Sequence, residues 1–172
     1  MSELEVFLVT DERNLEAVAG LMVRLKPEWW DHEGAIEQLG SGICWYAKSE
    51  DGYPIGWILA RYIAAYKTME IECLGYDGKG EMLIGAELND LIEAYENFAR
   101  QLGAVNSRFT IGSRGLSCHG KSLEKLSHEL DNIAVSDRLE YNWFLSRGYE
   151  AAGILPNIYG FGYHGIMLLK RL

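Results

Sequence analysis

The chain has 172 residues, enough to bury one hydrophobic core, and we expect residues 1–172 to form a single domain. Its net charge is −9, without a run of five or more Lys or Arg, so we expect no nucleic-acid partner. The acidic N-terminal residues and the lack of an apolar stretch of about eighteen residues predict no membrane partner and a cytoplasmic location. Three widely spaced cysteines are typical of reduced thiols rather than a disulfide framework.

The first half of the chain is predicted to form a strand, two helices and three further strands. Alternating apolar residues indicate a first strand over Glu5–Thr10, and Thr10 or Asp11 can cap the helix that follows. Lys26-Pro27 ends that helix, because proline disfavours a helical residue before it. The remaining elements are a short helix over Glu33–Leu39 and three strands over Ile43–Lys48, Ile55–Tyr62 and Tyr66–Tyr76. Asp51-Gly52 is a hairpin signal between the first two of these strands.

A long helix over Leu83–Leu102 follows, and then a strand over Val105–Ile111. Apolar residues recur every three to four positions along this helix and predict a buried stripe: Ile84, Leu88, Leu91, Tyr95, Phe98 and Leu102. Residues Gly112–Asp131 are harder to interpret. We expect a helix near Ser122–Leu130 with Ser122 as its cap, and the role of the segment (lid, dimer arm or plain insertion) stays open.

The last third of the chain carries the most informative pattern. Tyr141–Gly153 predicts a helix that ends at Arg147-Gly148-Tyr149 and leads into a strand. A Gly/Pro/Asn/Tyr loop and an apolar closing strand, His164–Leu172, come next. This order resembles the end of the GNAT superfamily of N-acetyltransferases. The resemblance implies an α+β fold with a mixed sheet of about seven strands and helices on both faces. Its strand meander is expected to be antiparallel, and the long helix to form a right-handed parallel crossover.

The resemblance also implies acetyl-CoA as co-substrate, with no metal. In the family the pyrophosphate binds at the start of the long helix, where free backbone N–H groups and the helix dipole favour an anion. Only Gly85 agrees with the family's Arg/Gln-x-x-Gly-x-Gly/Ala pattern, because Leu83 and Gly80 replace its other two positions. The candidate cofactor-binding residues here are Gly80, Met82, Leu83, Ile84, Gly85 and Ala86. The alternative is that Gly78 and Gly80 merely form a strand-to-helix turn.

The strand before this loop would supply the catalytic base. In the family its backbone, here at Cys73 and Leu74, binds the pantetheine arm and polarises the thioester carbonyl. Glu70 and Glu72 are expected on one face of the strand, and Glu72 is the first choice for general base. The alternative is a surface ion pair with Arg61 or Lys67.

The general acid is less clear from the sequence. The family often places a tyrosine four residues before the glycine of its Gly-aromatic pair, and that position is Phe144 here. Tyr141, one helical turn earlier, is the candidate acid in its place. Tyr159 and Tyr163 are further candidates. Each of these tyrosines is more often a packed aromatic residue than a catalyst, and water can protonate the thiolate in their place.

Aromatic and acidic residues suggest an acceptor site for a cationic amine, since both attract an ammonium group. They are Trp29, Trp30, Trp45, Tyr62, Tyr159, Tyr163, Glu28, Asp31 and Glu33. The alternative is that Trp45 belongs to the core and that the acidic residues form a solvated face.

The sequence therefore predicts an N-acetyltransferase that transfers an acetyl group from acetyl-CoA to an amine of a small molecule or protein. The alternative is a non-catalytic GNAT-like domain that binds acyl-CoA or a protein partner. A homodimer is possible. We expect neither a metal site at the four scattered histidines nor a nucleophilic Cys118-His119 pair, because no ligand spacing or local signature supports either.

Overall fold

The computed structural model describes residues 5–78, 86–133 and 139–172. The chain divides into two compact units, Met1–Ala104 and Val105–Leu172, and each is described by itself. The expectation of one domain therefore stays a prediction. The first unit contains β1 (Val6–Leu8), α1 (Glu12–Leu25), α2 (His32–Gly40), β2 (Ile43–Lys48), β3 (Pro54–Ile63), the short 3-10 helix η1 (Ala64–Tyr66), β4 (Thr68–Tyr76) and α3 (Ala86–Gln101).

The strands of the first unit lie in the order β1-β2-β3-β4, and each pair is antiparallel. The predicted meander is thus confirmed. β1 is shorter than expected, and β4 begins at Thr68 rather than at Tyr66. The later start has a local cause: η1 precedes β4, and Lys67 adopts a left-handed conformation with φ of 45°. A residue in that conformation cannot continue an extended strand.

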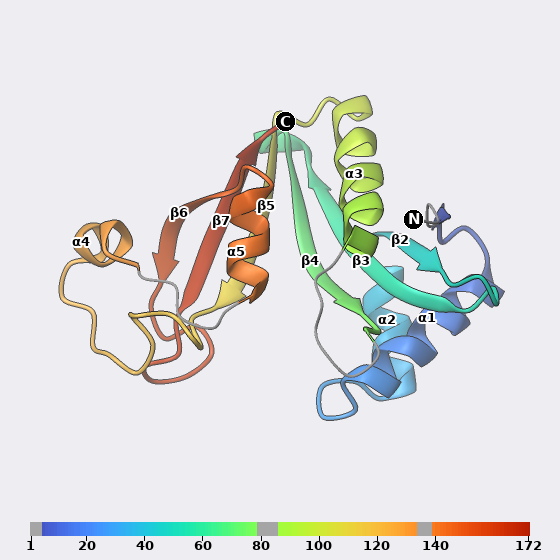
Figure 1. Cartoon of the computed structure of the whole chain (residues 1–172), viewed down its shortest axis with the longest axis horizontal. Helices are drawn as coiled ribbons and strands as arrows, with labels where there is room; N and C mark the ends of the chain where they lie inside the picture. The colour runs from blue at the N-terminus through green and yellow to red at the C-terminus, as the bar shows by residue number, and fades with distance from the viewer. Residues whose placement is uncertain (1–4, 79–85, 134–138) are drawn as a thin grey trace. The chain divides into compact units, whose positions relative to one another are not determined.

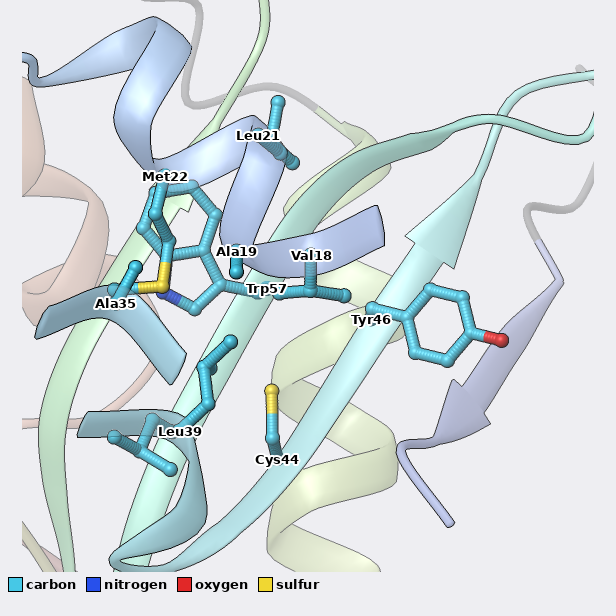
Figure 2. Close-up of a cluster of buried hydrophobic side chains, with 10 residues drawn as sticks. Val18, Ala19, Leu21, Met22, Ala35, Leu39, Cys44, Tyr46 and Trp57 are labelled. Atoms are coloured by element: carbon cyan, nitrogen blue, oxygen red, sulfur yellow. The ribbon is translucent and has the colours of Figure 1, made fainter. Parts of the chain in front are cut away.

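One face of this sheet is covered by α1 and α2 (Figure 1). Asp11 caps α1 by accepting a hydrogen bond from the Asn14 backbone N–H at 2.8 Å. The apolar side of α1 then packs with α2 and with side chains of β2 and β3 in one cluster (Figure 2). The cluster is mostly aliphatic, with one tyrosine and one tryptophan at its sheet side: Val18, Ala19, Leu21, Met22, Ala35, Leu39, Cys44, Tyr46, Trp57 and Leu59.

The other face of the same sheet packs against α3. Trp45 lies between Cys44 and Tyr46 on β2, so its side chain points to the opposite face. Its ring contacts Tyr95 and Phe98 of α3 at centroid distances of 5.5 and 5.3 Å. The predicted stripe is confirmed at Leu88, Leu91 and Tyr95. It is wrong at Leu102, which is 40% exposed because α3 has already ended at Gln101.

The second unit contains β5 (Asn106–Gly112), α4 (Leu126–Asp131), α5 (Leu139–Ser146), β6 (Glu150–Leu155) and β7 (Gly165–Arg171). Its strands lie in the order β5-β7-β6 with antiparallel pairing. Phe144 of α5 packs against Phe109 of β5 and Tyr149, with ring centroids 5.0 Å apart in both pairs. Gly148 ends the α5 turn with φ of 84°, as the sequence predicts.

The segment after β5 is mostly an ordered loop. The expected helix is present as α4, but it begins at Leu126, so the predicted start and cap at Ser122 are wrong, and no side chain caps it. The loop is held instead by buried polar groups: Ser113 Oγ accepts from the His164 backbone N–H at 3.0 Å, and the Ser113 N–H donates to the His164 carbonyl at 2.8 Å. His164 Nδ1 accepts from the Asn157 N–H at 3.1 Å. These bonds join the loop to the β6–β7 connection.

The fold class is confirmed as a mixture of helices with seven mostly antiparallel strands. The first unit has helices on both faces of its strands, as expected. The parallel crossover through α3 stays a prediction. Among the helices of the three described ranges, none is both long and apolar enough to cross a membrane.

Candidate functional site

Glu72 is the extra residue of a bulge in β4. Leu59 of β3 pairs with Cys73 and Ala60 pairs with Ile71, so Glu72 has no partner across the strand pair. A bulge breaks the strict alternation of side chains. Glu72 contacts α2, and the next residue, Cys73, also packs against the α1–α2 cluster. The Glu72 side chain stays on the face of Glu70 and reaches the C-terminal end of α2.

Both carboxylate oxygens of Glu72 have close neighbours. Arg61 Nη2 of β3 lies 3.2 Å from Oε1. Gln38 Nε2 of α2 donates to Oε2 at 3.3 Å, and Ser41 Oγ is also 3.3 Å from Oε2. The single Ser41 hydroxyl proton has a shorter acceptor in the Gln38 carbonyl, at 2.7 Å. Arg61 and Gln38 are therefore the stronger constraints on the carboxylate.

Glu70 shares this face of the strand. It lies directly opposite Arg61 in the β3–β4 register, and its Oε2 is 4.0 Å from Arg61 Nη2. Glu70 and Glu72 thus face the same way, as expected, and the alternative of an ion pair with Arg61 is present in the structure. An ion pair and a catalytic role are compatible, because Arg61 has a long side chain that is 59% exposed, whereas the Glu72 side chain is only 16% exposed.

Cys73 and Leu74 pair with Leu59 and Ile58 of β3. The Cys73 side chain packs against the α1–α2 cluster. Burial raises the pKa of its thiol to about 11. The nearby indole N–H of Trp57 offsets only a small part of this rise, because its approach to the thiol does not reach hydrogen-bond geometry. The side chain of Cys73 is therefore an inert core group, and its predicted role rests on its backbone.

The cofactor-binding prediction falls largely outside the described residues. Gly80, Met82, Leu83, Ile84 and Gly85 lie there, and Ala86 is the first described residue of α3. On the strand side, Asp77 follows β4 and forms an ion pair with Arg24, in the last turn of α1. Pyrophosphate binding by the Gly80–Ala86 segment stays a prediction.

In the second unit, Tyr141 is a buried residue of α5. Burial, followed by the nearby Cys118 thiol, raises the pKa of its phenol, so the hydroxyl keeps its proton at neutral pH. A general acid must begin protonated, but a raised pKa also makes proton release harder. Phe144 is buried in the aromatic cluster of this unit.

Tyr159 and Tyr163 lie together in the β6–β7 connection, with ring centroids 5.0 Å apart. His119 contacts the Tyr163 ring edge-on, and the Arg114 guanidinium lies 5.4 Å above it. Tyr163 is therefore packed among neighbours, whereas Tyr159 is 50% exposed.

The proposed acceptor residues of the first unit separate into core and surface groups. Trp45 is core, as its alternative interpretation held, and Trp30 packs against the α1–α2 cluster. Trp29 is exposed, but its ring already has Lys26 Nζ 5.0 Å from its centroid. Asp31 caps α2 by accepting from the Gly34 N–H at 2.7 Å. Glu28 and Glu33 are exposed, and Tyr62 is half-buried.

The Cys118-His119 pair is not a nucleophilic arrangement. Cys118 is fully buried, and this burial raises the pKa of its thiol. His119 Nδ1 instead pairs with Ser113 Oγ at 3.0 Å. In the part of the chain that the structure describes, no three His, Cys, Asp or Glu side chains are placed to hold a metal ion.

Sequence reasoning missed Gln38 and Ser41. Both lie at the end of α2, and the packing of α2 on the sheet brings them to Glu72. The Gly40-Ser41-Gly42 terminator marked the end of this helix in the sequence. It carried no signal of which strand residue the helix end would meet.

No protein-family model matches the sequence, and no curated protein matches it either. Solved structures do match. An aminoglycoside 6'-N-acetyltransferase complexed with coenzyme A superposes with a TM-score of 0.81 at 18% identity, over 96% of both chains. The aminoglycoside 6'-N-acetyltransferase from Enterococcus faecium gives the same values. A Desulfovibrio desulfuricans structure described under the GNAT family of acetyltransferases gives 0.67 at 12% identity, over 98% of both chains. The resemblance in the last third of the sequence is thereby confirmed: this chain has the GNAT fold.

Proposed function

We propose that this protein is an acetyl-CoA-dependent N-acetyltransferase that acts on an amine of a small molecule or protein. The observation that carries the proposal is the fold similarity to an aminoglycoside 6'-N-acetyltransferase complexed with coenzyme A, over 96% of both chains. A fold alone does not fix an activity. The second support is therefore the Glu72 carboxylate of β4, which is held by Arg61 of β3 and Gln38 of α2.

The proposed reaction is a direct transfer. The amine nitrogen attacks the thioester carbonyl carbon of acetyl-CoA while Glu72 accepts the proton that the amine loses. The C–S bond then breaks, the acetyl group stays on nitrogen, and the thiolate of coenzyme A takes a proton from Tyr141 or water. Backbone groups at Cys73 and Leu74 would hold the carbonyl oxygen as it becomes negative.

The geometry around Glu72 suits a base. Its side chain is mostly buried, which limits competition from water, and Gln38 fixes its Oε2. The exposed Arg61 can move without changing the backbone. Two of the matching structures are aminoglycoside 6'-N-acetyltransferases, so we propose a small cationic amine as the first acceptor class to test.

The first experiment is thermal unfolding with increasing acetyl-CoA, with adenosine diphosphate for comparison. Ligand at one hundred times its dissociation constant stabilises the folded state by about 2.7 kcal/mol, which raises Tm by several degrees. Gly85→Asp should reduce the shift, because it places a negative charge in the proposed pyrophosphate segment. No shift at millimolar acetyl-CoA would contradict the proposal.

The second experiment measures thiol release from acetyl-CoA with a panel of amines. Glu72→Gln removes the proton acceptor but keeps the shape of the side chain, and we expect kcat to fall about 10²-fold. Glu37→Gln, an exposed change on α2, is the matched control and should leave kcat unchanged. Equal rates in wild type and Glu72→Gln would rule out Glu72 as the base.

A non-catalytic domain that binds acyl-CoA or a protein is the second candidate. The observation in its favour is Phe144, which stands at the family's usual tyrosine position and is buried among aromatic rings. It cannot donate a proton. A saturable acetyl-CoA shift without thiol release for any amine would support this candidate.

A further inference from the structure

The Glu72 carboxylate requires a compensating positive charge. Its side chain is only 16% exposed, and an unpaired carboxylate that has lost most of its water is unfavourable. Within the described residues, the one cation at salt-bridge distance is Arg61, with Nη2 3.2 Å from Oε1. Any cationic amine that approaches Oε1 must therefore compete with a guanidinium that is already there.

Arg61 also has a second acceptor nearby. Its direct partner across the strands is Glu70, yet its guanidinium lies closer to Glu72, at 3.2 Å, than to Glu70, at 4.0 Å. The Arg61 side chain is 59% exposed and has four rotatable bonds. A change of rotamer can therefore carry its charge from Glu72 to Glu70 without movement of either strand.

Gln38 can keep the Glu72 carboxylate in position when Arg61 moves away. Its amide donates to Oε2, the oxygen away from the 3.2 Å Arg61 contact, and so can hold the carboxylate in place after Arg61 leaves. The amide is neutral and does not repel an incoming cation. Arg61 thus occupies the position next to Oε1 and can leave it, while the neutral amide of Gln38 continues to bind Oε2.

We propose that Arg61 is the exchangeable counter-ion of Glu72: a cationic amine displaces it, and Arg61 moves to Glu70. This inference rests on the proposed function, because it takes Glu72 as the group that receives the amine. It makes Arg61 a specificity-determining residue. An ammonium group can replace the guanidinium at the carboxylate, whereas a neutral amine leaves the Arg61–Glu72 ion pair intact.

The test is the affinity for spermidine and kanamycin, which are cationic at pH 7, with neutral aniline as comparison. Binding is measured by calorimetry on the full chain, independently of turnover. Arg61→Gln should bind at least one cationic probe at least fivefold more tightly than wild type, while Arg61→Lys keeps the wild-type affinity. Arg13→Gln, an exposed change on α1 with the same loss of charge, should have no effect. Urea unfolding checks that each variant folds.

Two double variants separate the exchange from a general charge effect. Adding Glu72→Gln to Arg61→Gln should remove the gain in affinity. Glu70→Gln should weaken binding at least twofold when Arg61 is present and have no effect when it is absent. Equal or weaker binding by Arg61→Gln, a gain that survives Glu72→Gln, or no binding by either protein would overturn the inference.

Thiol release from acetyl-CoA, measured on the same variants, separates this inference from the proposed function. Tighter binding by Arg61→Gln without acetyl transfer supports the exchange and contradicts the enzyme. Acetyl transfer without tighter binding by Arg61→Gln supports the enzyme and overturns the exchange.

Discussion

The two units of this protein are stabilised by different kinds of interior. The unit formed by residues 1–104 buries mostly aliphatic side chains of α1 and α2 on one face of its strands, and it packs Trp45 against Tyr95 and Phe98 of α3 on the other. The unit formed by residues 105–172 combines an aromatic cluster around Phe144 with buried polar groups at Ser107, Ser113 and His164. The stabilisation from apolar burial depends mainly on the area buried, whereas buried polar groups need hydrogen-bond partners at defined positions. The first interior should tolerate small changes more readily than the second.

The largest effect is expected at the aromatic cluster. Phe144→Ala removes a ring that packs against Phe109, Trp143 and Tyr149, and leaves a cavity. We expect a loss of about 4 kcal/mol in the free energy of unfolding, measured by urea denaturation. Asn142→Ala, an exposed change on the same helix, should cost less than about 0.5 kcal/mol. A loss below 1 kcal/mol for Phe144→Ala would mean that the cluster is not a core.

The next effect concerns Cys73, a half-buried thiol of the first unit. Burial holds the pKa of Cys73 at about 11, above its value in the unfolded chain, so the unfolded state loses its proton first as pH rises. The stabilising effect is complete below about pH 9 and is lost progressively toward pH 11, by about 2 kcal/mol. Urea titrations from pH 8 to 11 measure this decline. In Cys73→Ala, the free energy of unfolding should decline less over this pH range. Parallel declines for the two proteins would show that the Cys73 thiol is not the cause.

Ser113→Ala probes the polar interior of the second unit. It leaves the buried His164 N–H without its acceptor and removes the partner of His119 Nδ1. We expect a loss of about 2 kcal/mol and faster proteolysis within residues 113–125. Ser146→Ala is the control, since that exposed hydroxyl bonds only to the preceding turn of its own helix. Unchanged proteolysis would show that the loop is held by other contacts.

The smallest effect is expected on the first unit, and it is a gain. Gly20 is an exposed residue inside α1, and a Cβ placed there meets nothing within 4 Å. Gly20→Ala should stabilise the protein by about 0.5–1 kcal/mol, because alanine loses less backbone entropy in a helix. Gly42→Ala is the opposite case, since its Cβ would lie 2.6 Å from the Ala60 carbonyl oxygen. Thermal unfolding should move Tm in opposite directions for these two variants.

The sequence by itself determined the elements whose signals are local. Asp11, Pro27 and the spacing of apolar residues mark α1, and Leu88, Leu91 and Tyr95 mark the buried side of α3. The order of elements was enough to predict the GNAT fold, and alternation along β4 placed Glu70 and Glu72 on one face. These features follow from the repeat of a helix or strand and from the conformational limits of single residues.

Only the tertiary structure decided the surroundings of these residues. The bulge at Glu72 arises from the pairing of β3 with β4. The packing of α2 on the sheet brings Gln38 to the carboxylate from 34 residues away along the chain. Ser113 and His164 meet in the same way across 51 residues. Neither contact follows the periodicity of a helix or strand, so no pattern in the sequence predicts it. A long-range polar contact depends on where the packed elements place each atom, and that is a property of the whole fold.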